Sequence, residues 1–135
     1  MFPDWETREI FVLVRSYKSP VIIVSIAIAV LSLLEAPYVS AAQQFSDKLL
    51  HSLGYLVLAI TALWALADWS AKRVWHYFVA CTYVVVYGGV IELLQAWCTQ
   101  TRTGDWLDWL ADVLGAMVGL IIVYVVSLGI SLHDV

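Results

Sequence analysis

Residues 113–132 read VLGAMVGLIIVYVVSLGISL, and none of these side chains carries a charge. A helix that crosses a bilayer needs about 20 such residues. Three more runs are free or nearly free of charge, at 19–34, 49–67 and 74–91. Helices satisfy their own backbone hydrogen bonds in lipid, so four such runs predict an all-α polytopic membrane protein with a bundle of four transmembrane helices.

The overall composition agrees with this assignment. The 135 residues are 62% hydrophobic with a mean hydropathy of +0.85, whereas about 45–50% apolar residues is usual in soluble domains. Seven Lys and Arg face eleven Asp and Glu without a basic stripe, so nucleic acid is not a predicted partner. We expect one membrane domain over residues 1–135, with the lipid bilayer as its partner and its oligomeric state left open. Its spans are placed roughly at 19–38, 49–68, 74–99 and 107–130.

The positive charges predict the orientation of the bundle. Three lie in the amino-terminal arm and two in the second connection, whereas the alternate loops hold only Lys48 and Arg102. Short loops rich in Lys and Arg stay in the cytoplasm. Both termini are therefore predicted to be cytoplasmic, and the first and third connections are predicted to face outward.

Polar residues follow one face of two predicted helices near these outward connections. In the second helix, i, i+4, i+8 spacing stacks Asp47, His51 and Tyr55 on one side. Spacings of three and four do the same for three aspartates of the fourth helix: Asp105, Asp108 and Asp112. A carboxylate in the first turn also suits the positive end of a helix.

Glu92 lies inside the predicted third span, about 12 Å below its outer end, with Gln95 one turn above it. An ionisable side chain at the centre of a span costs roughly 2.5–3.5 kcal/mol on insertion scales, so it normally faces a partner or water. The predicted partners of Glu92 are His51, Lys48 and Arg102, which approach from the same side.

Three segments resemble the VanZ-like family, small bacterial membrane proteins of about four spans. They are DKLLHSLGY at 47–55, GGVIELLQAW at 88–97 and RTGDWLDWLADVLGAMVG at 102–119. The polar and glycine signature of the family falls on Asp47, Lys48, His51, Glu92, Gln95, Arg102, Asp108, Gly115 and Gly119. One position departs from the family pattern, because Asp112 stands where Asn is usual and adds a possible negative charge. The spacing of Gly115 and Gly119 favours close helix packing.

The resemblance implies a multi-pass protein of the bacterial cytoplasmic membrane with a role in the cell envelope. The family is named for a protein associated with low-level resistance to teicoplanin, a glycopeptide with a lipid tail. The resemblance therefore implies reduced antibiotic susceptibility to such compounds. It implies no particular reaction.

An outward polar pocket for an anionic lipid or a lipid-linked cell-wall precursor is the leading hypothesis. In it, Lys48, Arg102 and protonated His51 meet phosphate. The full set of predicted ligand-binding residues is Asp47, Lys48, His51, Glu92, Gln95, Arg102 and Asp108.

Two other roles remain open for these residues. In an enzyme acting on a lipid phosphate, His51 is the general acid or base, Glu92 or Asp108 orients it, and Arg102 stabilises negative charge. In a structural or assembly protein, the same residues only lock the bundle through caps and ion pairs. A divalent metal held by Asp47, His51, Asp105 and Asp108 is a further alternative, since carboxylate oxygens suit hard cations. No cofactor or metal is predicted, because no recognised ligand spacing occurs.

Overall fold

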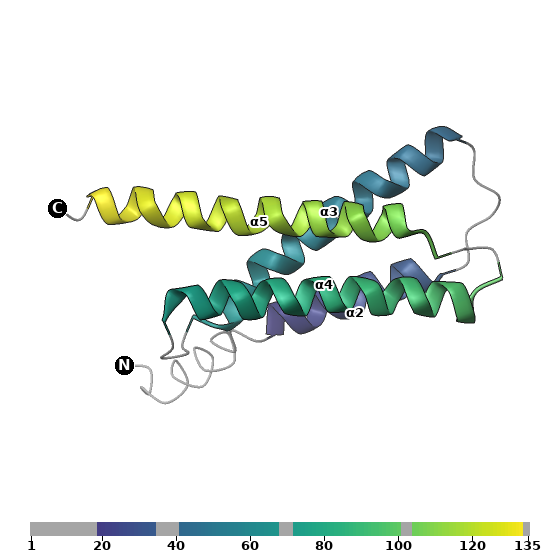
Figure 1. Ribbon diagram of the computed structural model, residues 1–135, viewed down its shortest axis with the longest axis horizontal. Coiled ribbons are helices and arrows are strands. Elements are labelled where there is room, and N and C mark those ends of the chain that lie inside the picture. Colours follow the sequence, from purple (N-terminus) through teal and green to yellow (C-terminus); the bar gives the residue numbers. More distant parts are fainter. Residues whose placement is uncertain (1–18, 35–40, 68–71, 101–103, 134–135) are drawn as a thin grey trace, which may run out of the picture.

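The computed structural model describes residues 19–34, 41–67, 72–100 and 104–133. Within these ranges the protein is all-helical, as predicted. Its four helices are α2 (Ser19–Leu33), α3 (Ala41–Ala65), α4 (Arg73–Cys98) and α5 (Trp106–His133). Successive helices run in opposite directions, and α3 crosses behind α5 at an angle (Figure 1). The start of α3, the end of α4 and the start of α5 therefore lie at the same end of the molecule (Figure 1).

Three of the described helices are long and apolar enough to cross a membrane. The candidate spans are Asp47–Ala65, Arg73–Cys98 and Trp106–Leu128. Helix α2 has 15 residues and is about 22 Å long, shorter than the roughly 30 Å of a bilayer core. Residues 35–38 of the predicted first span lie outside the described residues. By length and composition, the chain is a small helical membrane protein.

Burial separates the side chains as expected for lipid surroundings. Large apolar side chains such as Ile23, Val86 and Ile121 are exposed on the outside of the bundle. Buried polar or charged side chains lie between the helices, namely Ser32, His51, Glu92, Gln95 and Asp112. A soluble protein of this size would tend to place these two classes the other way round.

The tightest contact in the fold lies between α3 and α5. A Cβ on Gly115 would come within 1.9 Å of the Ser52 carbonyl oxygen, and one on Gly119 within 2.6 Å of the Leu56 carbonyl oxygen. Glycine is therefore required for the two backbones to approach this closely. The packing role predicted for Gly115 and Gly119 is confirmed.

Hydrogen bonds across the interior tie α2 to α4. The Tyr87 hydroxyl donates to the Ser25 carbonyl oxygen at 2.5 Å, and Gln95 Nε2 donates to the Ser32 carbonyl oxygen at 2.9 Å. The predicted site residue Gln95 thus serves as a link between helices. Such bonds hold α2 in register where apolar side chains alone would allow it to slide in lipid.

Candidate functional site

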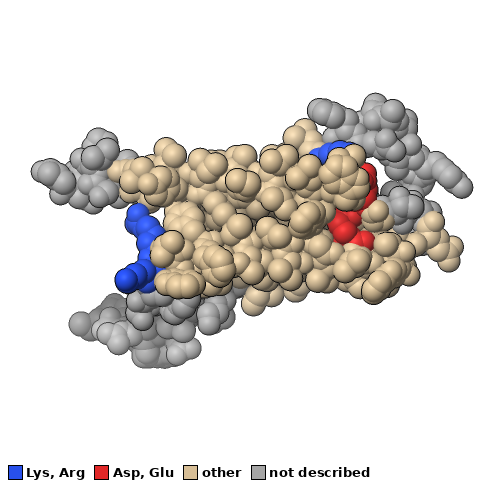
Figure 2. All heavy atoms as spheres, in the orientation of Figure 1, with Lys and Arg blue, Asp and Glu red and all other residues tan. Residues whose placement is uncertain are grey.

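Charged side chains of the described residues separate to the two ends of the bundle. Acidic side chains gather at one end with a basic group beside them, and a second basic group occupies the opposite end (Figure 2). We call the first group the polar cluster, and its members are Lys48, His51, Tyr55, Glu92, Asp105, Asp108 and Asp112. It has a partly exposed outer layer and a buried inner layer.

Lys48 and two aspartates form the outer layer. Lys48 Nζ donates to Asp105 Oδ2 at 3.1 Å and also to Asp108 Oδ1. The exposed fractions are 34% for Lys48, 38% for Asp105 and 17% for Asp108, so these groups remain within reach of water or a ligand. The ion pairs join the start of α3 to the start of α5.

Asp105 also caps α5. Its Oδ1 atom accepts a hydrogen bond from the Leu107 amide at 2.9 Å, which satisfies a backbone donor that the helix leaves free. This amide, together with the Lys48 ammonium, lowers the pKa of the Asp105 carboxyl group. The carboxylate therefore stays ionised at the start of α5, where negative charge is favoured.

His51 and Asp112 form the centre of the inner layer. His51 Nδ1 lies 3.1 Å from Asp112 Oδ1, at hydrogen-bond distance, and the side chains are only 7% and 2% exposed. Asp112 Oδ2 and the Tyr55 hydroxyl are buried without a hydrogen-bond partner among the described residues. A Cβ on Gly88 would come within 3.2 Å of Asp112 Oδ2 and of Tyr55 Cε1, so glycine leaves room for both.

Glu92 completes the inner layer from α4. Its Oε2 atom accepts a hydrogen bond from the Asp105 amide at 2.9 Å, while its buried Oε1 atom has no such partner in the part of the chain that is described. A Cβ on Gly104 would lie 2.6 Å from the Glu92 carbonyl oxygen. The absence of a side chain at Gly104 thus allows the start of α5 to pack on α4 beside Glu92.

The cluster brings together four of the seven predicted ligand-binding residues: Lys48, His51, Glu92 and Asp108. Asp47 is half-buried one turn before His51. Gln95 is turned to α2, and Arg102 lies outside the described residues. Its predicted contact with phosphate stays a prediction.

The partners within the cluster differ from those expected. Of the predicted partners of Glu92, His51 comes close, since ligand atoms of His51, Glu92 and Asp112 lie within 4.8 Å of one another. Lys48 pairs with the aspartates of α5 instead. His51 was expected to be oriented by Glu92 or Asp108. Its hydrogen-bond partner is Asp112, whereas Asp108 pairs with Lys48.

Sequence reasoning did not assign a site role to Asp112 or Tyr55. The spacing contained a signal for both, because Asp112 follows Asp108 by one turn and Tyr55 follows His51 by one turn.

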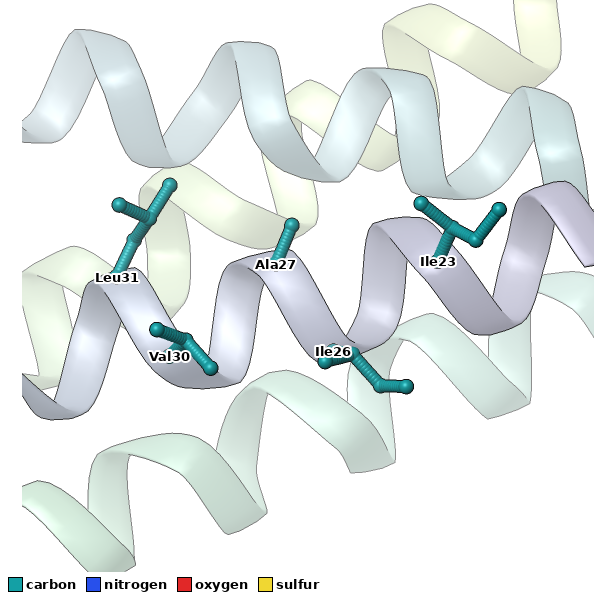
Figure 3. A pocket seen from close by; sticks show the side chains of 5 residues that line it. All are labelled: Ile23, Ile26, Ala27, Val30 and Leu31. Atoms are coloured by element: carbon teal, nitrogen blue, oxygen red, sulfur yellow. The ribbon is translucent and has the colours of Figure 1, made fainter.

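An apolar hollow lies elsewhere, on α2. Figure 3 shows the five side chains that line it, all of them on this helix: Ile23, Ile26, Ala27, Val30 and Leu31. It has no charged lining residue and shares no residue with the polar cluster. Lipid chains suit such a surface, and we assign it no specific ligand.

Comparisons with known proteins give no relative from which a role could be transferred. No family model matches the chain, and no curated protein and no solved structure is similar enough to be matched. The geometry of the polar cluster is therefore the main indication of function.

Proposed function

We propose that the chain is a VanZ-like multi-pass protein of the bacterial cytoplasmic membrane, with both termini in the cytoplasm. Its polar cluster faces outward and engages the headgroup of an anionic or lipid-linked envelope amphiphile, which lowers susceptibility to lipid-tailed glycopeptides. The observation that supports this role best is the partly exposed outer layer, in which Lys48 lies at the end of an apolar bundle. A headgroup can reach this layer while its chains stay in lipid.

The charges of the cluster limit how an anion can bind. Four carboxylates face one lysine among its members, and Lys48 gives hydrogen bonds to two of them. An ammonium group has three N–H donors, so a phosphate oxygen can accept the third. Asp108 then acts against the ligand, because it competes for Lys48 and repels negative charge.

This competition gives a sharp test on the full chain in detergent. Native mass spectrometry should show retained phosphatidylglycerol that Lys48→Ala releases. Lys72→Ala removes an exposed lysine at the start of α4, at the other end of the bundle, and should retain the lipid. Asp108→Asn should bind the lipid more tightly by about 1 kcal/mol, or roughly fivefold.

Two results would count against this function. If Lys48→Ala and Asp108→Asn retain as much lipid as the unchanged chain, headgroup binding at the outer layer is excluded. If the variants lose bound lipid only in proportion to their loss of helix content, these residues serve only to stabilise the helix bundle. Circular dichroism of each variant separates these outcomes.

The hydrogen bond between His51 and Asp112 favours a second candidate, an enzyme acting on a lipid phosphate. A carboxylate that holds one imidazole nitrogen fixes the ring and leaves the other nitrogen for proton transfer. Asp112 would then be a positioning residue for His51. Turnover of a lipid phosphate should vanish in His51→Gln while the variant stays folded and still binds lipid, and unchanged turnover there would exclude this reaction.

A further inference from the structure

We propose that His51, Glu92 and Asp112 form a binding site for one divalent transition-metal cation, with Zn²⁺ or Mn²⁺ as the best fit. This inference goes beyond the proposed function and stands independently of it. It rests on the convergence of three ligating side chains and on buried carboxylate oxygens that lack partners.

The three side chains converge from three different helices. His51 comes from α3, Glu92 from α4 and Asp112 from α5, and one ligand atom of each lies within 4.8 Å of the others. Ligand atoms around tetrahedral Zn²⁺ lie about 2.0–2.2 Å from the metal and so roughly 3.4 Å apart. Metal binding at this site therefore requires the three ligand atoms to move closer together.

The donor types select the class of cation. One imidazole nitrogen and two carboxylate oxygens suit Zn²⁺, Mn²⁺ or Fe²⁺ better than Ca²⁺ or Mg²⁺, which prefer oxygen ligands alone. Three protein ligands leave at least one position for water or a ligand oxygen.

Unpartnered oxygen atoms provide a second and independent indication. Glu92 is 8% exposed and Asp112 is 1% exposed, and Glu92 Oε1 and Asp112 Oδ2 have no hydrogen-bond partner among the described residues. Burial of an unpaired carboxylate costs several kcal/mol. A divalent cation balances the two negative charges and supplies the missing contacts.

Neighbouring groups support this assignment. Lys48, the positive charge of the outer layer, is held by Asp105 and Asp108 and does not neutralise the inner carboxylates. The Tyr55 hydroxyl, buried and without a partner among the same residues, can donate to a metal-bound water. Outer partners of this kind orient metal ligands.

Metal binding can be measured on the full chain in detergent after treatment with EDTA and desalting. Titration calorimetry with Zn²⁺ and with Mn²⁺ should give one site per chain. Glu92→Gln and Asp112→Asn keep the shape of each side chain and should weaken binding at least as much as loss of an outer partner does, roughly 10–100-fold. His76→Gln removes an imidazole near the start of α4, at the opposite end of the bundle. It is the control and should keep the affinity.

A measurement on the unchanged chain covers the case in which the variants do not fold. X-ray absorption of the Zn²⁺-loaded protein should show one imidazole among nitrogen and oxygen ligands. The assignment is overturned if the unchanged chain binds neither metal, if the spectrum lacks imidazole, or if His76→Gln loses as much affinity as the inner-layer variants.

Discussion

The single residue Asp105 makes contacts that connect α3, α4 and α5. Its carboxylate caps α5 at the Leu107 amide and accepts from Lys48 of α3, while its own amide donates to Glu92 of α4. Gly104 makes this possible, because a Cβ there would meet the Glu92 carbonyl oxygen. The pair Gly104 and Asp105 thus fixes the outer rim of the cluster.

At the residue scale we expect Asp105→Ala to lower the free energy of unfolding by about 1 kcal/mol, the usual cost of a lost cap. Asp105→Asn should cost less, because its amide oxygen can still accept from Leu107. Thermal unfolding in detergent measures both. Equal stability of the unchanged chain and Asp105→Ala would contradict this role.

The lowered pKa of Asp105 adds a dependence on pH. A carboxyl group whose pKa falls on folding stabilises the fold above its ordinary pKa of about 4, and this contribution disappears as the pH falls through the folded-state pKa. The stability difference between the unchanged chain and Asp105→Asn should therefore shrink below about pH 4. A difference that stays constant from pH 7 to pH 3 would contradict it.

The sequence predicted which faces carry polar groups better than it predicted their pairing. The sequence predicted that His51, Glu92 and Asp108 lie at the same end of the bundle. The structure places all three at that end. The partner of His51 depends on the rotation of α3 against α5, which spacing along either helix does not determine. The proposed metal ligands show no characteristic spacing in the sequence, because they come from three different helices.

At the element scale, the crossing of α3 and α5 determines that rotation. Gly115 touches the backbone at Ser52, which follows His51 directly, and Asp112 lies three residues before Gly115. The contact that sets the distance between the helices is therefore within one turn of the buried pair. The close packing at Gly115 therefore also determines how His51 and Asp112 face each other.

We expect Gly115→Ala to destabilise the bundle by about 1–3 kcal/mol, the typical cost of overpacking, because its methyl group would overlap the Ser52 carbonyl. Gly54→Ala is the matched control, since a Cβ at Gly54 would meet only Ile28 side-chain atoms at 3.7 and 3.8 Å. Unfolding of both variants in detergent provides the comparison. Similar stabilities would show that the close crossing does not exist in solution.

Helix positions followed the apolar runs closely for α4 and α5. The bounds Arg73–Cys98 and Trp106–His133 cover the expected spans at 74–99 and 107–130 almost completely. Helix α3 begins earlier than the span at 49–68, at Ala41. The polar residues before position 49 lower the local hydropathy, but they do not end the helix, because Ala, Gln and Lys favour helix formation. Hydropathy marks the part in lipid and does not mark the helix end.

At the scale of the whole molecule, the two ends differ in charge. The polar cluster lies where α5 begins. Lys72 and Arg73 lie at the start of α4, and Figure 2 shows basic groups at that opposite end. Positive loops are retained in the cytoplasm. This polarity supports an outward-facing cluster, which the proposed binding of a lipid headgroup requires.

Site-directed labelling measures that orientation most directly. In a chain with Cys81→Ala and Cys98→Ala, single cysteines are introduced as Gln100→Cys beside the cluster or Lys72→Cys at the other end. Both positions are exposed. With a membrane-impermeant maleimide on bacterial spheroplasts, Gln100→Cys should label in intact spheroplasts and Lys72→Cys only after permeabilisation. The reverse pattern would place the polar cluster in the cytoplasm and contradict the proposed role at the envelope.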